Sequence, residues 1–339
     1  MLRNVDRALR TQYVRSRAPL FTMTVVVIVN PVSGRHGGGP SRVSALADRA
    51  AAVLASLGVT ATIRLTERAG HATEIAAAAL DAGADRVVAW GGDGTVNEVA
   101  AALAFTPAAL AIVPAGSGNG LARELQVPLD PIDAIRAAVE GEPRAIDVGE
   151  LAGRRFLNVA GIGVDARVAH AFEARRRGRH GLRDYVRVSL RELRAYAPSP
   201  CTVTVDGETL RAKPLLIAIA NSAQYGNGAR IAPQARPDDG ELDLVVVEAT
   251  SPWRDIWRAR RLFTGTMARD PHVRVRRGTV VRVDGPGDMA AHVDGQPFTL
   301  GPCAEATVHP AALRVIAPRG ASPVGAGSRR PAAASHSKR

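Results

Sequence analysis

The amino-acid sequence predicts an α/β protein with a doubly wound N-terminal sheet and a C-terminal β-sandwich domain that carries helical insertions. The chain has 339 residues, more than one domain usually holds, so two domains are expected. Up to about residue 145, strand-length apolar runs alternate with segments of helical periodicity. Beyond that point the predicted strands follow one another closely, which favours an antiparallel arrangement.

The first predicted strand is TVVVIVN at 24–30, a β-branched run that is typical of a buried parallel strand. The segment 41–57 spaces its apolar residues as on one face of a helix, and Gly58 follows as a C-cap. The alternation continues with a strand at 59–65, a helix at 71–82, a strand at 86–90, a helix at 95–104 and a strand at 109–113. This order predicts a parallel sheet covered by helices on both faces.

The second half is expected to be rich in strands, at 146–151, 155–160, 201–205, 214–220, 242–248, 272–276, 279–284 and 305–309. Helical periodicity interrupts them at 165–197 and 252–268. We therefore expect one domain at 23–145 and a β-rich domain at 146–304. A poorly ordered basic extension at 1–22 and a disordered basic tail at 318–339 flank them, and Met23 is an alternative start.

The composition, 46% hydrophobic and 22% charged, excludes a mostly disordered chain. The formal net charge of +12 is concentrated at the two ends and in two internal stretches, 167–194 and 254–277. This uneven distribution argues against a nucleic-acid coat, and we expect no specific nucleic-acid partner. Two cysteines, Cys201 and Cys303, make no disulfide framework, which favours a reducing cytoplasm. No apolar run approaches the roughly 18 residues that a membrane-spanning helix needs.

A glycine-rich loop, GGDGT at 91–95, stands between a predicted strand and a predicted helix. Its glycines let the backbone turn sharply and approach a ligand, and the helix N-terminus offers free N–H groups to an anion. Asp93 would lie at the carboxyl end of a parallel strand, where open α/β sheets bind ligands. An acid in such a loop indicates that it holds a metal or takes a proton. The alternative is a tight turn with Asp93 as the N-cap.

Two similar loops follow other predicted strands, NPVSG at 30–34 and PAGSGNG at 114–120. The three loops would share one edge of the sheet, which predicts a nucleotide site. The chain has no GxxxxGK[ST] loop, and no GxGxxG opens its first helix. These absences argue against a P-loop enzyme and against an ordinary dinucleotide dehydrogenase.

The motifs NPVSG, GGDGTVNE, PAGSGNGLAR, Gly-x-Gly at 161–163 and PDDGELDL at 237–244 occur in this order. Over roughly residues 23–317 the chain resembles the diacylglycerol kinase catalytic family, which includes sphingosine kinases and bacterial lipid kinases. The resemblance implies a NAD kinase-like nucleotide-binding domain and a β-rich domain for the lipid substrate. It also implies that the segment 305–317 returns to the nucleotide-binding domain. It implies transfer of the γ-phosphoryl group of ATP to a hydroxyl of diacylglycerol or a sphingoid-type lipid, with Mg²⁺ as cofactor.

The resemblance also implies a cytoplasmic enzyme, peripheral on the inner membrane face, that meets its lipid substrate at an anionic membrane surface. A homodimer is one possible assembly. The residues expected along the nucleotide are Asn30, Pro31, Val32, Ser33, Gly34, Thr66, Gly91, Gly92, Gly94, Thr95, Asn97, Gly116, Ser117 and Asn119. Asp93 is the expected catalytic residue, which would orient or deprotonate the hydroxyl or hold Mg²⁺. Asp239 matches an acid that holds magnesium, with the backbone carbonyls of Arg236 and Glu241.

Two positions depart from the pattern of bacterial diacylglycerol kinases. Gln296 stands where the family's proposed base is a Glu, and an amide does not accept a proton usefully at neutral pH. Either Asp93 accepts the proton, or the reaction relies on the positioning of the reactants and on a metal ion. The second is reasonable because the transition state of phosphoryl transfer is often loose and needs little base catalysis. His292 lies nearby, but one histidine is thin evidence for a replacement base. Gly120 stands where an Asp is usual, which is nearer to sphingosine kinases and leaves the lipid class open.

Several alternatives stay open at this point. GGDGT also occurs in NAD kinases, and Gln296 allows a catalytically weakened protein that only binds nucleotide or lipid. Asp165 either contacts the substrate headgroup or serves as a cap or turn residue. The stretch Arg175–His180 is either a solvated loop or a patch against anionic lipid headgroups.

Two helical segments carry apolar residues next to arginines. We expect an apolar stripe in the first segment to pack in the core, with a lipid channel as the alternative: Val186, Leu190, Leu193 and Ala197. In the second, we favour core packing with a basic outer face over an interfacial helix for the residues Trp253, Ile256, Trp257 and Phe263.

Overall fold

The computed structural model of the chain describes residues 23–33, 39–173, 182–226 and 228–321. The extension at 1–22, Gly34, the stretch Arg175–His180 and most of the tail predicted at 318–339 lie outside the described residues. Among the described residues, no helix combines the length and the apolar character that crossing a membrane requires.

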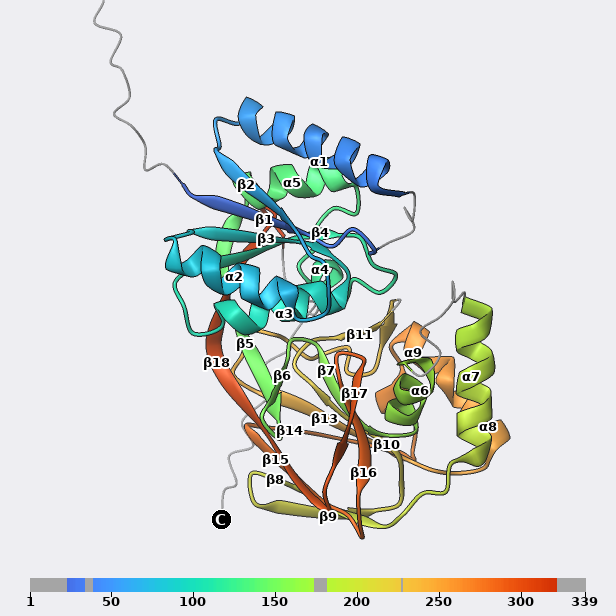
Figure 1. Ribbon diagram of the computed structural model, residues 1–339. Helices are drawn as coiled ribbons and strands as arrows, with labels where there is room; N and C mark the ends of the chain where they lie inside the picture. The colour runs from blue at the N-terminus through green and yellow to red at the C-terminus, as the bar shows by residue number, and fades with distance from the viewer. Residues whose placement is uncertain (1–22, 34–38, 174–181, 227, 322–339) are drawn as a thin grey trace, which may run out of the picture.

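Four parallel strands form the N-terminal layer in the order β2-β1-β3-β4. They are β1 (Val25–Val29), β2 (Ala61–Leu65), β3 (Arg86–Gly91) and β4 (Ala109–Pro114). Helices α1 (Gly39–Ser56) and α5 (Pro131–Glu140) cover one face, and α2 (His71–Asp81) and α3 (Asp93–Leu103) cover the other (Figure 1). All residues of β1 and β4 are buried, as strands covered on both faces require. The predicted doubly wound layer is confirmed.

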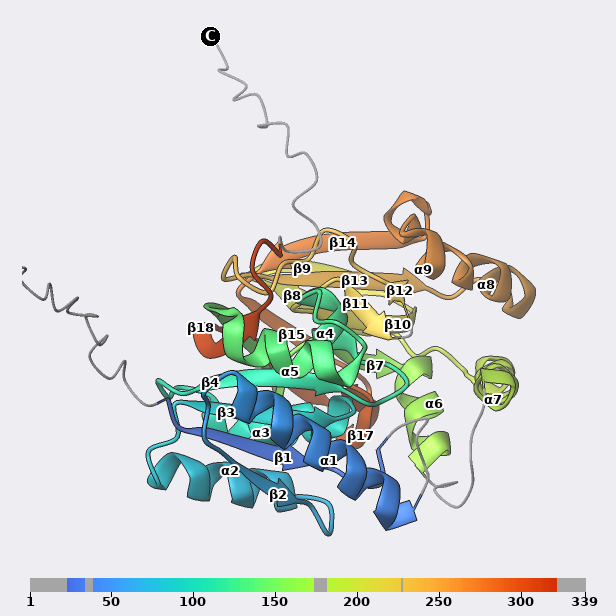
Figure 2. The same cartoon turned by 90° about the horizontal axis from the view of Figure 1, so that it is seen from above.

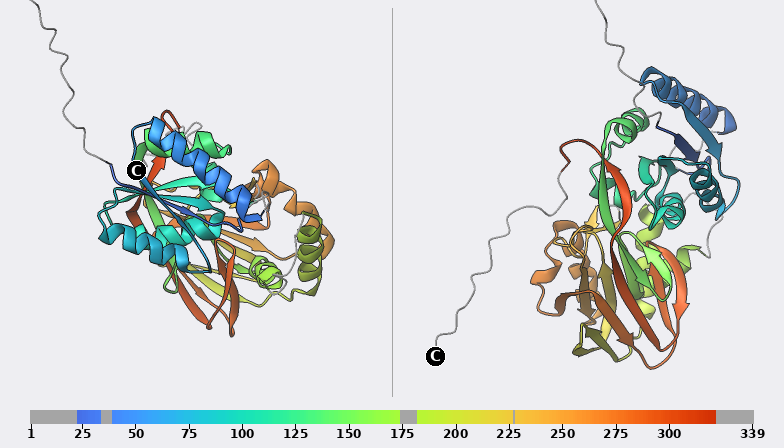
Figure 3. Two further views of the ribbon diagram at one scale, coloured as in Figure 1. Left: turned by 45° about the horizontal axis from the view of Figure 1, so that its top comes forward. Right: turned by 90° about the vertical axis from the view of Figure 1, so that its left-hand side faces the viewer.

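One long strand, β18 (Cys303–Ala317), connects this layer to the rest of the molecule (Figure 3). Its end lies parallel to β4, and residues 306–309 and 313–317 pair antiparallel with β5 (Glu142–Leu151). β18 then continues the sheet into three further strands: β15 (Val280–Asp284), β8 (Cys201–Val205) and β9 (Glu208–Ala212). A short strand, β6 (Arg154–Phe156), pairs with β5.

A second, antiparallel sheet packs on this extension in the order β14-β13-β10-β7-β16-β17. Its strands are β7 (Val159–Gly163), β10 (Pro214–Ala220), β13 (Leu242–Glu248), β14 (Val273–Gly278), β16 (Met289–Val293) and β17 (Gln296–Leu300). Ile217 and Ile219 of β10 face the first sheet, where they join Val203 and Val281 in one core. The alternate residues of β10 face a third core with side chains from the helices on the outer face. This confirms the predicted sandwich.

The helical insertions are more divided than predicted. The segment 165–197 forms α6 (Val164–Glu173) and α7 (Leu182–Ala195), and 252–268 forms α8 (Pro252–Ala259), α9 (Arg261–Thr264) and a 3₁₀ turn at Met267–Arg269. Gly265, at φ 64°, ends α9 in the left-handed conformation that favours glycine. The remaining short elements are α4 (Gly120–Glu124), β11 (Gln224–Gly226) and β12 (Ala229–Arg230).

Two packing predictions for these helices need correction. Among the side chains of α7 that the structure describes, Val188 and Glu192 are buried. The predicted core residues Leu190 and Leu193 are only partly buried, and Ala197 is exposed beyond the helix end. Glu192 is held inside because Arg167 and Arg191 pair with it. The side chain of Val186 lies outside the described set. In α8 and α9 the predicted core packing of the aromatic residues is wrong, because the rings of Trp253, Trp257 and Phe263 are exposed.

The hairpin of β16 and β17 was absent from the predicted strands. Its turn is Asp294-Gly295, with φ of 45° and 81°, which is the left-handed pair that a two-residue hairpin loop requires. Asp-Gly between strand-forming residues is a hairpin signal in its own right, and the resemblance of this stretch to a catalytic motif obscured it.

After the glycine loop at 114–120, the short helix α4 ends on a buried carboxyl group. Glu124 is 1% exposed. Burial raises the pKa of Glu124 from 4.5 to about 7, against the lowering effect of Arg230. The folded state therefore binds this proton more tightly than the unfolded chain does.

We expect this carboxyl group to make the folded state less stable as the pH rises. Its stabilising effect is complete below pH 4.5 and is lost as the pH rises to about 7, which amounts to about 3 kcal/mol. The substitution Glu124→Gln should remove that slope and raise the free energy of unfolding at pH 7.5, measured by urea denaturation at several pH values. Glu140→Gln, an exposed residue that also ends its helix, is the control. Equal pH slopes for wild type and Glu124→Gln would contradict this prediction.

Candidate functional site

The three glycine loops meet at the carboxyl edge of the parallel strands. The backbone N–H of Asn30 donates to the carbonyl of Trp90 at 2.9 Å, and its side-chain amide donates to the Thr95 hydroxyl at 3.0 Å. The N–H of Ala115 donates to the carbonyl of Gly91 at 2.8 Å. These contacts join the first and third loops to the central GGDGT loop.

The GGDGT loop and the 114–120 loop touch through their backbones. A Cβ added to Gly116 would lie 2.7 Å from the Cα of Gly92, closer than real Cβ contacts come. A Cβ on Gly91 would meet the Thr95 side chain at 2.4 Å. Packing alone therefore requires glycine at positions 91 and 116, whether or not a ligand binds there. By contrast, a Cβ on Gly94 would meet no atom within 4 Å.

Asp93 links the same two loops through its side chain. One carboxylate oxygen accepts the N–H of Asn119 at 2.9 Å, and the other accepts the N–H of Gly120 at 2.6 Å. Gly92, not Asp93, is the N-cap of α3, so the carboxylate satisfies the first N–H groups of α4 instead. Each oxygen keeps a further lone pair, and Asp93 lines a pocket.

The other residues predicted along the nucleotide lie around these loops. Thr66, buried, donates its N–H to Val29 at the end of β1, while Val32 and Ser117 are exposed. The side-chain amide of Asn97 donates to Asp294 of the β16–β17 hairpin at 3.2 Å. The set thus gathers at one edge, at the positions Asn30, Pro31, Val32, Ser33, Thr66, Gly91, Gly92, Gly94, Thr95, Gly116, Ser117 and Asn119.

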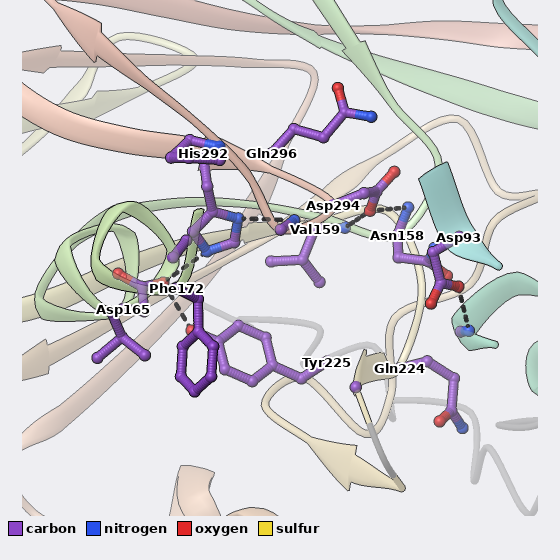
Figure 4. A pocket seen from close by; sticks show the side chains of 16 residues that line it. Asp93, Asn158, Val159, Asp165, Phe172, Gln224, Tyr225, His292, Asp294 and Gln296 are labelled. Atoms are coloured by element: carbon purple, nitrogen blue, oxygen red, sulfur yellow. Dashed lines mark hydrogen bonds and ion pairs between the residues drawn. The ribbon is translucent and has the colours of Figure 1, made fainter. Parts of the chain in front are cut away.

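A pocket of about 450 Å³ opens between this edge and the β-rich half. Asp93 and Gly120 form one end, and α6, β11 and the β16–β17 hairpin form the rest (Figure 4). Val168, Ala169 and Phe172 of α6 supply an apolar wall. The pocket therefore offers a polar end beside the glycine loops and a partly apolar end beside α6.

Asp294 holds the hairpin in place at the floor of this pocket. Its carboxylate accepts the backbone N–H groups of Leu157, Asn158 and Val159 at 2.7, 3.0 and 2.9 Å. Burial raises the pKa of Asp294, although these N–H groups act to lower it. The sequence assigned no role to Asp294, and its hydrogen-bond partners lie more than 130 residues away.

A second cluster faces the pocket at the end away from Asp93 (Figure 4). The carboxylate of Asp165 accepts hydrogen bonds from the Tyr225 hydroxyl at 2.6 Å and the N–H of Ala166 at 2.9 Å, and lies 3.0 Å from Nε2 of His292. Burial acts to raise the pKa of Asp165, but His292 and Tyr225 outweigh it and hold the pKa below its ordinary value. Nδ1 of His292 accepts the N–H of Gly295 at 3.3 Å, so Nε2 carries the proton toward Asp165.

The sequence identified Asp165 and His292 separately but missed Tyr225. No local pattern marks this tyrosine, which is 60 residues from its carboxylate partner. Gln296 lines the rim of the same pocket as the first residue of β17, where it is exposed.

The predicted magnesium residues lie apart from this pocket's lining. The carboxylates of Asp239, Glu241 and Asp243 all pair with Arg277. Within the described part of the chain, no group of three or more His, Cys, Asp or Glu side chains is arranged to hold a metal. One guanidinium thus faces three carboxylates, and magnesium binding by Asp239 stays a prediction. Coordination by the carbonyls of Arg236 and Glu241 stays a prediction.

Comparison with known proteins gives two family matches that together cover most of the described chain. Residues 24–151 match the "Diacylglycerol kinase catalytic domain", and residues 158–317 match the "YegS C-terminal NAD kinase beta sandwich-like domain". These ranges agree with the parallel layer and the sandwich.

Individual relatives match over nearly the same length. A "Diacylglycerol kinase" of Mycobacterium tuberculosis is 34% identical over 302 residues, which cover 87% of this chain and 95% of that protein. A "Probable lipid kinase YegS-like" of Pectobacterium atrosepticum is 33% identical over 249 residues, or 71% and 81% of the two chains. The crystal structure of a putative diacylglycerol kinase from Bacillus anthracis superposes with a TM-score of 0.72 at 23% identity and covers 88% and 98% of the chains, which shows the common fold.

Gly94 offers a test of how closely a nucleotide approaches the central loop. Since its Cβ would meet nothing, Gly94→Ala should leave the melting temperature unchanged or slightly raised, because Ala favours a helix over Gly. If phosphates lie against this backbone, the added methyl should weaken ATP binding about tenfold or more, measured by titration calorimetry. Gly287→Ala, equally open but remote from the loops, should change neither property. Unchanged ATP affinity in Gly94→Ala would place the nucleotide elsewhere.

Proposed function

The chain belongs to the lipid kinase family that carries the diacylglycerol kinase catalytic domain, and we propose that it transfers the γ-phosphoryl group of ATP to the hydroxyl of diacylglycerol. One observation carries this proposal: a single pocket has Asp93 and the glycine loops at one end and a hydrogen-bonded Asp–His–Tyr cluster with an apolar wall at the other. Such a pocket has room for both reactants of a phosphoryl transfer.

The glycine loops are suited to the phosphates of ATP. The first turn of α3 begins at Asp93 and presents backbone N–H groups toward the loop edge. Ser117, exposed on the third loop, adds a hydroxyl donor. Oxygen-rich phosphates placed here would be held by neutral donors and by the helix dipole.

Asp93 is the group that we assign to the lipid hydroxyl. The hydroxyl oxygen forms the new bond to the γ-phosphorus while the bond to the β–γ bridging oxygen breaks and ADP leaves. The hydroxyl proton passes to Asp93 or to solvent. Because two backbone N–H groups fix the carboxylate, its free lone pairs have a set direction. Magnesium bound with the phosphates would neutralise their charge, and Asp93 is the pocket carboxylate placed to hold it.

The other end of the pocket favours a neutral headgroup over an amine. The carboxylate of Asp165 is already engaged by His292, Tyr225 and a backbone N–H. A sphingoid ammonium would have to displace these partners, whereas the ester groups of diacylglycerol only accept hydrogen bonds and need not uncover the charge of Asp165. The α6 wall is suited to the first carbons of the acyl chains.

Radiolabelled ATP with detergent-dispersed diacylglycerol, sphingosine, ceramide or phosphatidylglycerol tests this proposal. Labelled phosphatidic acid is expected, and Asp93→Asn should lower kcat by about two to three powers of ten. Asp85→Asn is the control, since Asp85 also accepts a backbone N–H, at the opposite end of β3. Preferential labelling of sphingosine would refute the lipid assignment. Formation of NADP from NAD without lipid would identify a NAD kinase instead.

Gln296→Glu tests whether the departure from the family's base limits the rate. Gln296 lies on the exposed rim of the pocket, so the substitution should be tolerated in the fold. If Asp93 orients the hydroxyl and little base catalysis is needed, kcat should change less than about threefold at pH 7.5. An increase of about a hundredfold would mean that the wild-type chain lacks its base and is a weakened kinase.

A further inference from the structure

Helices α8 and α9 turn charged groups inward and aromatic groups outward. Arg258 lies on the inner side, where its guanidinium pairs with Asp255 at 2.8 Å and with Asp270 at 3.1 Å. Both carboxylates are buried. The outer side carries the rings of Trp253, Trp257 and Phe263, which are 70%, 71% and 68% exposed. A water-facing helix normally has the reverse pattern, so this outer side is built for a partner.

Arginines surround these rings. The guanidinium of Arg194 lies 5.3 Å from the ring centre of Trp253, and that of Arg260 lies 4.7 Å from the ring centre of Trp257. Arg187 and Arg191 precede Arg194 on the exposed side of α7, and Arg254 is exposed on α8. We call this surface the α7–α9 patch: Arg187, Arg191, Arg194, Trp253, Arg254, Trp257, Arg260 and Phe263.

We propose that the α7–α9 patch docks the enzyme on the surface of an anionic bilayer. Tryptophan rings prefer the boundary between headgroups and acyl chains, and arginines at the same level attract anionic headgroups. Two acids next to the patch, Asp255 and Asp270, are turned inward onto Arg258. Glu192 pairs with Arg191, so the charge of the patch comes from its other four arginines. The choice of a bilayer as partner rests on the proposed function, since a kinase for diacylglycerol must reach a lipid.

The position of the patch fits this role. α7 packs against α6 and α8, and α6 forms the apolar wall of the pocket. The views in Figures 1 and 2 agree that α6, α7 and α8 lie together on one side of the β-rich half. Docking through the patch therefore brings the α6 end of the pocket toward the membrane, and leaves the glycine loops on the side of water, where ATP is found.

The three tryptophans of the chain allow a direct test. Trp90 is buried in β3, so the two tryptophans of α8 are the ones that a membrane can reach. Vesicles of phosphatidylglycerol and phosphatidylcholine should shift the emission to shorter wavelength, and brominated lipids should quench it. The variant Trp253→Phe/Trp257→Phe should show neither effect. In co-sedimentation, Trp253→Ala/Trp257→Ala and Arg254→Gln/Arg260→Gln should each weaken binding about tenfold or more, and high salt should act mainly through the arginines.

Phe105→Ala is the matched control, because Phe105 is also an exposed ring with an arginine over it, but packs beside β18 against His309. It should bind vesicles like wild type. Vesicle binding that is absent, or that survives in Trp253→Ala/Trp257→Ala, would overturn the inference. The inference would also be overturned if Trp253→Ala/Trp257→Ala lost dimerisation, measured by sedimentation without lipid, but still bound vesicles.

The kinase assay in detergent separates this inference from the proposed function. The variants Trp253→Ala/Trp257→Ala and Arg254→Gln/Arg260→Gln should both phosphorylate detergent-dispersed short-chain diacylglycerol at the wild-type rate. They should lose activity only when the substrate is presented in vesicles. Vesicle binding through the patch without any lipid phosphorylation would refute the proposed function alone. Phosphorylation with binding that ignores the patch would refute the docking surface alone.

Discussion

The carboxylate of Asp93 holds together the edge on which the site depends. Two glycine loops meet there with backbone against backbone at Gly92 and Gly116, and the side chain of Asn119 accepts the N–H of Gly116 at 2.9 Å. Asp93 satisfies the N–H groups of Asn119 and Gly120, which would otherwise begin α4 without partners. A buried donor left unpaired costs about 1–3 kcal/mol, so the same carboxylate that lines the pocket also keeps the loops in register.

A second carboxylate extends this constraint to the other half of the molecule. Asp294 binds the backbone at 157–159 and receives the amide of Asn97, which lies on the helix that Asp93 begins. The hairpin with His292 and Gln296 is thereby tied to the phosphate edge. β18, which runs beside both β4 and β5, fixes the two halves at the opposite side. The pocket lies between these ties and is lined by α6, β11, the β16–β17 hairpin and the first residues of α3 and α4.

The local sequence was sufficient for the strands of the parallel layer and the helices between them, because strand and helix periods alternate from Val25 to Pro114. The helices α4 and α5 that follow β4 were not predicted. The local sequence was sufficient for the glycine loops as well, because strand ends in such a layer share one edge. It was insufficient where function depends on contacts between distant segments: Tyr225 on Asp165, or Asp294 on Leu157. The prediction for α8 was also wrong, because the spacing of its aromatic residues places them on one face of the helix but does not say whether that face is buried or exposed. Only the buried pairing of Arg258 with Asp255 and Asp270 decides which side is inside.

The replacement of an acid at Gln296 is understandable from the same geometry. A carboxylate at this exposed position on the rim of the pocket would be solvated and loosely held. A proton acceptor contributes most when the lipid hydroxyl must be ionised before it attacks the γ-phosphorus. In a loose phosphoryl transfer the hydroxyl needs direction more than ionisation. Asp93, gripped by two N–H groups, supplies direction through a rigid frame that Gln296 does not touch. If the proposed reaction is correct, catalysis depends on the rigidity of the loop edge, and the residue at position 296 on the rim is free to vary.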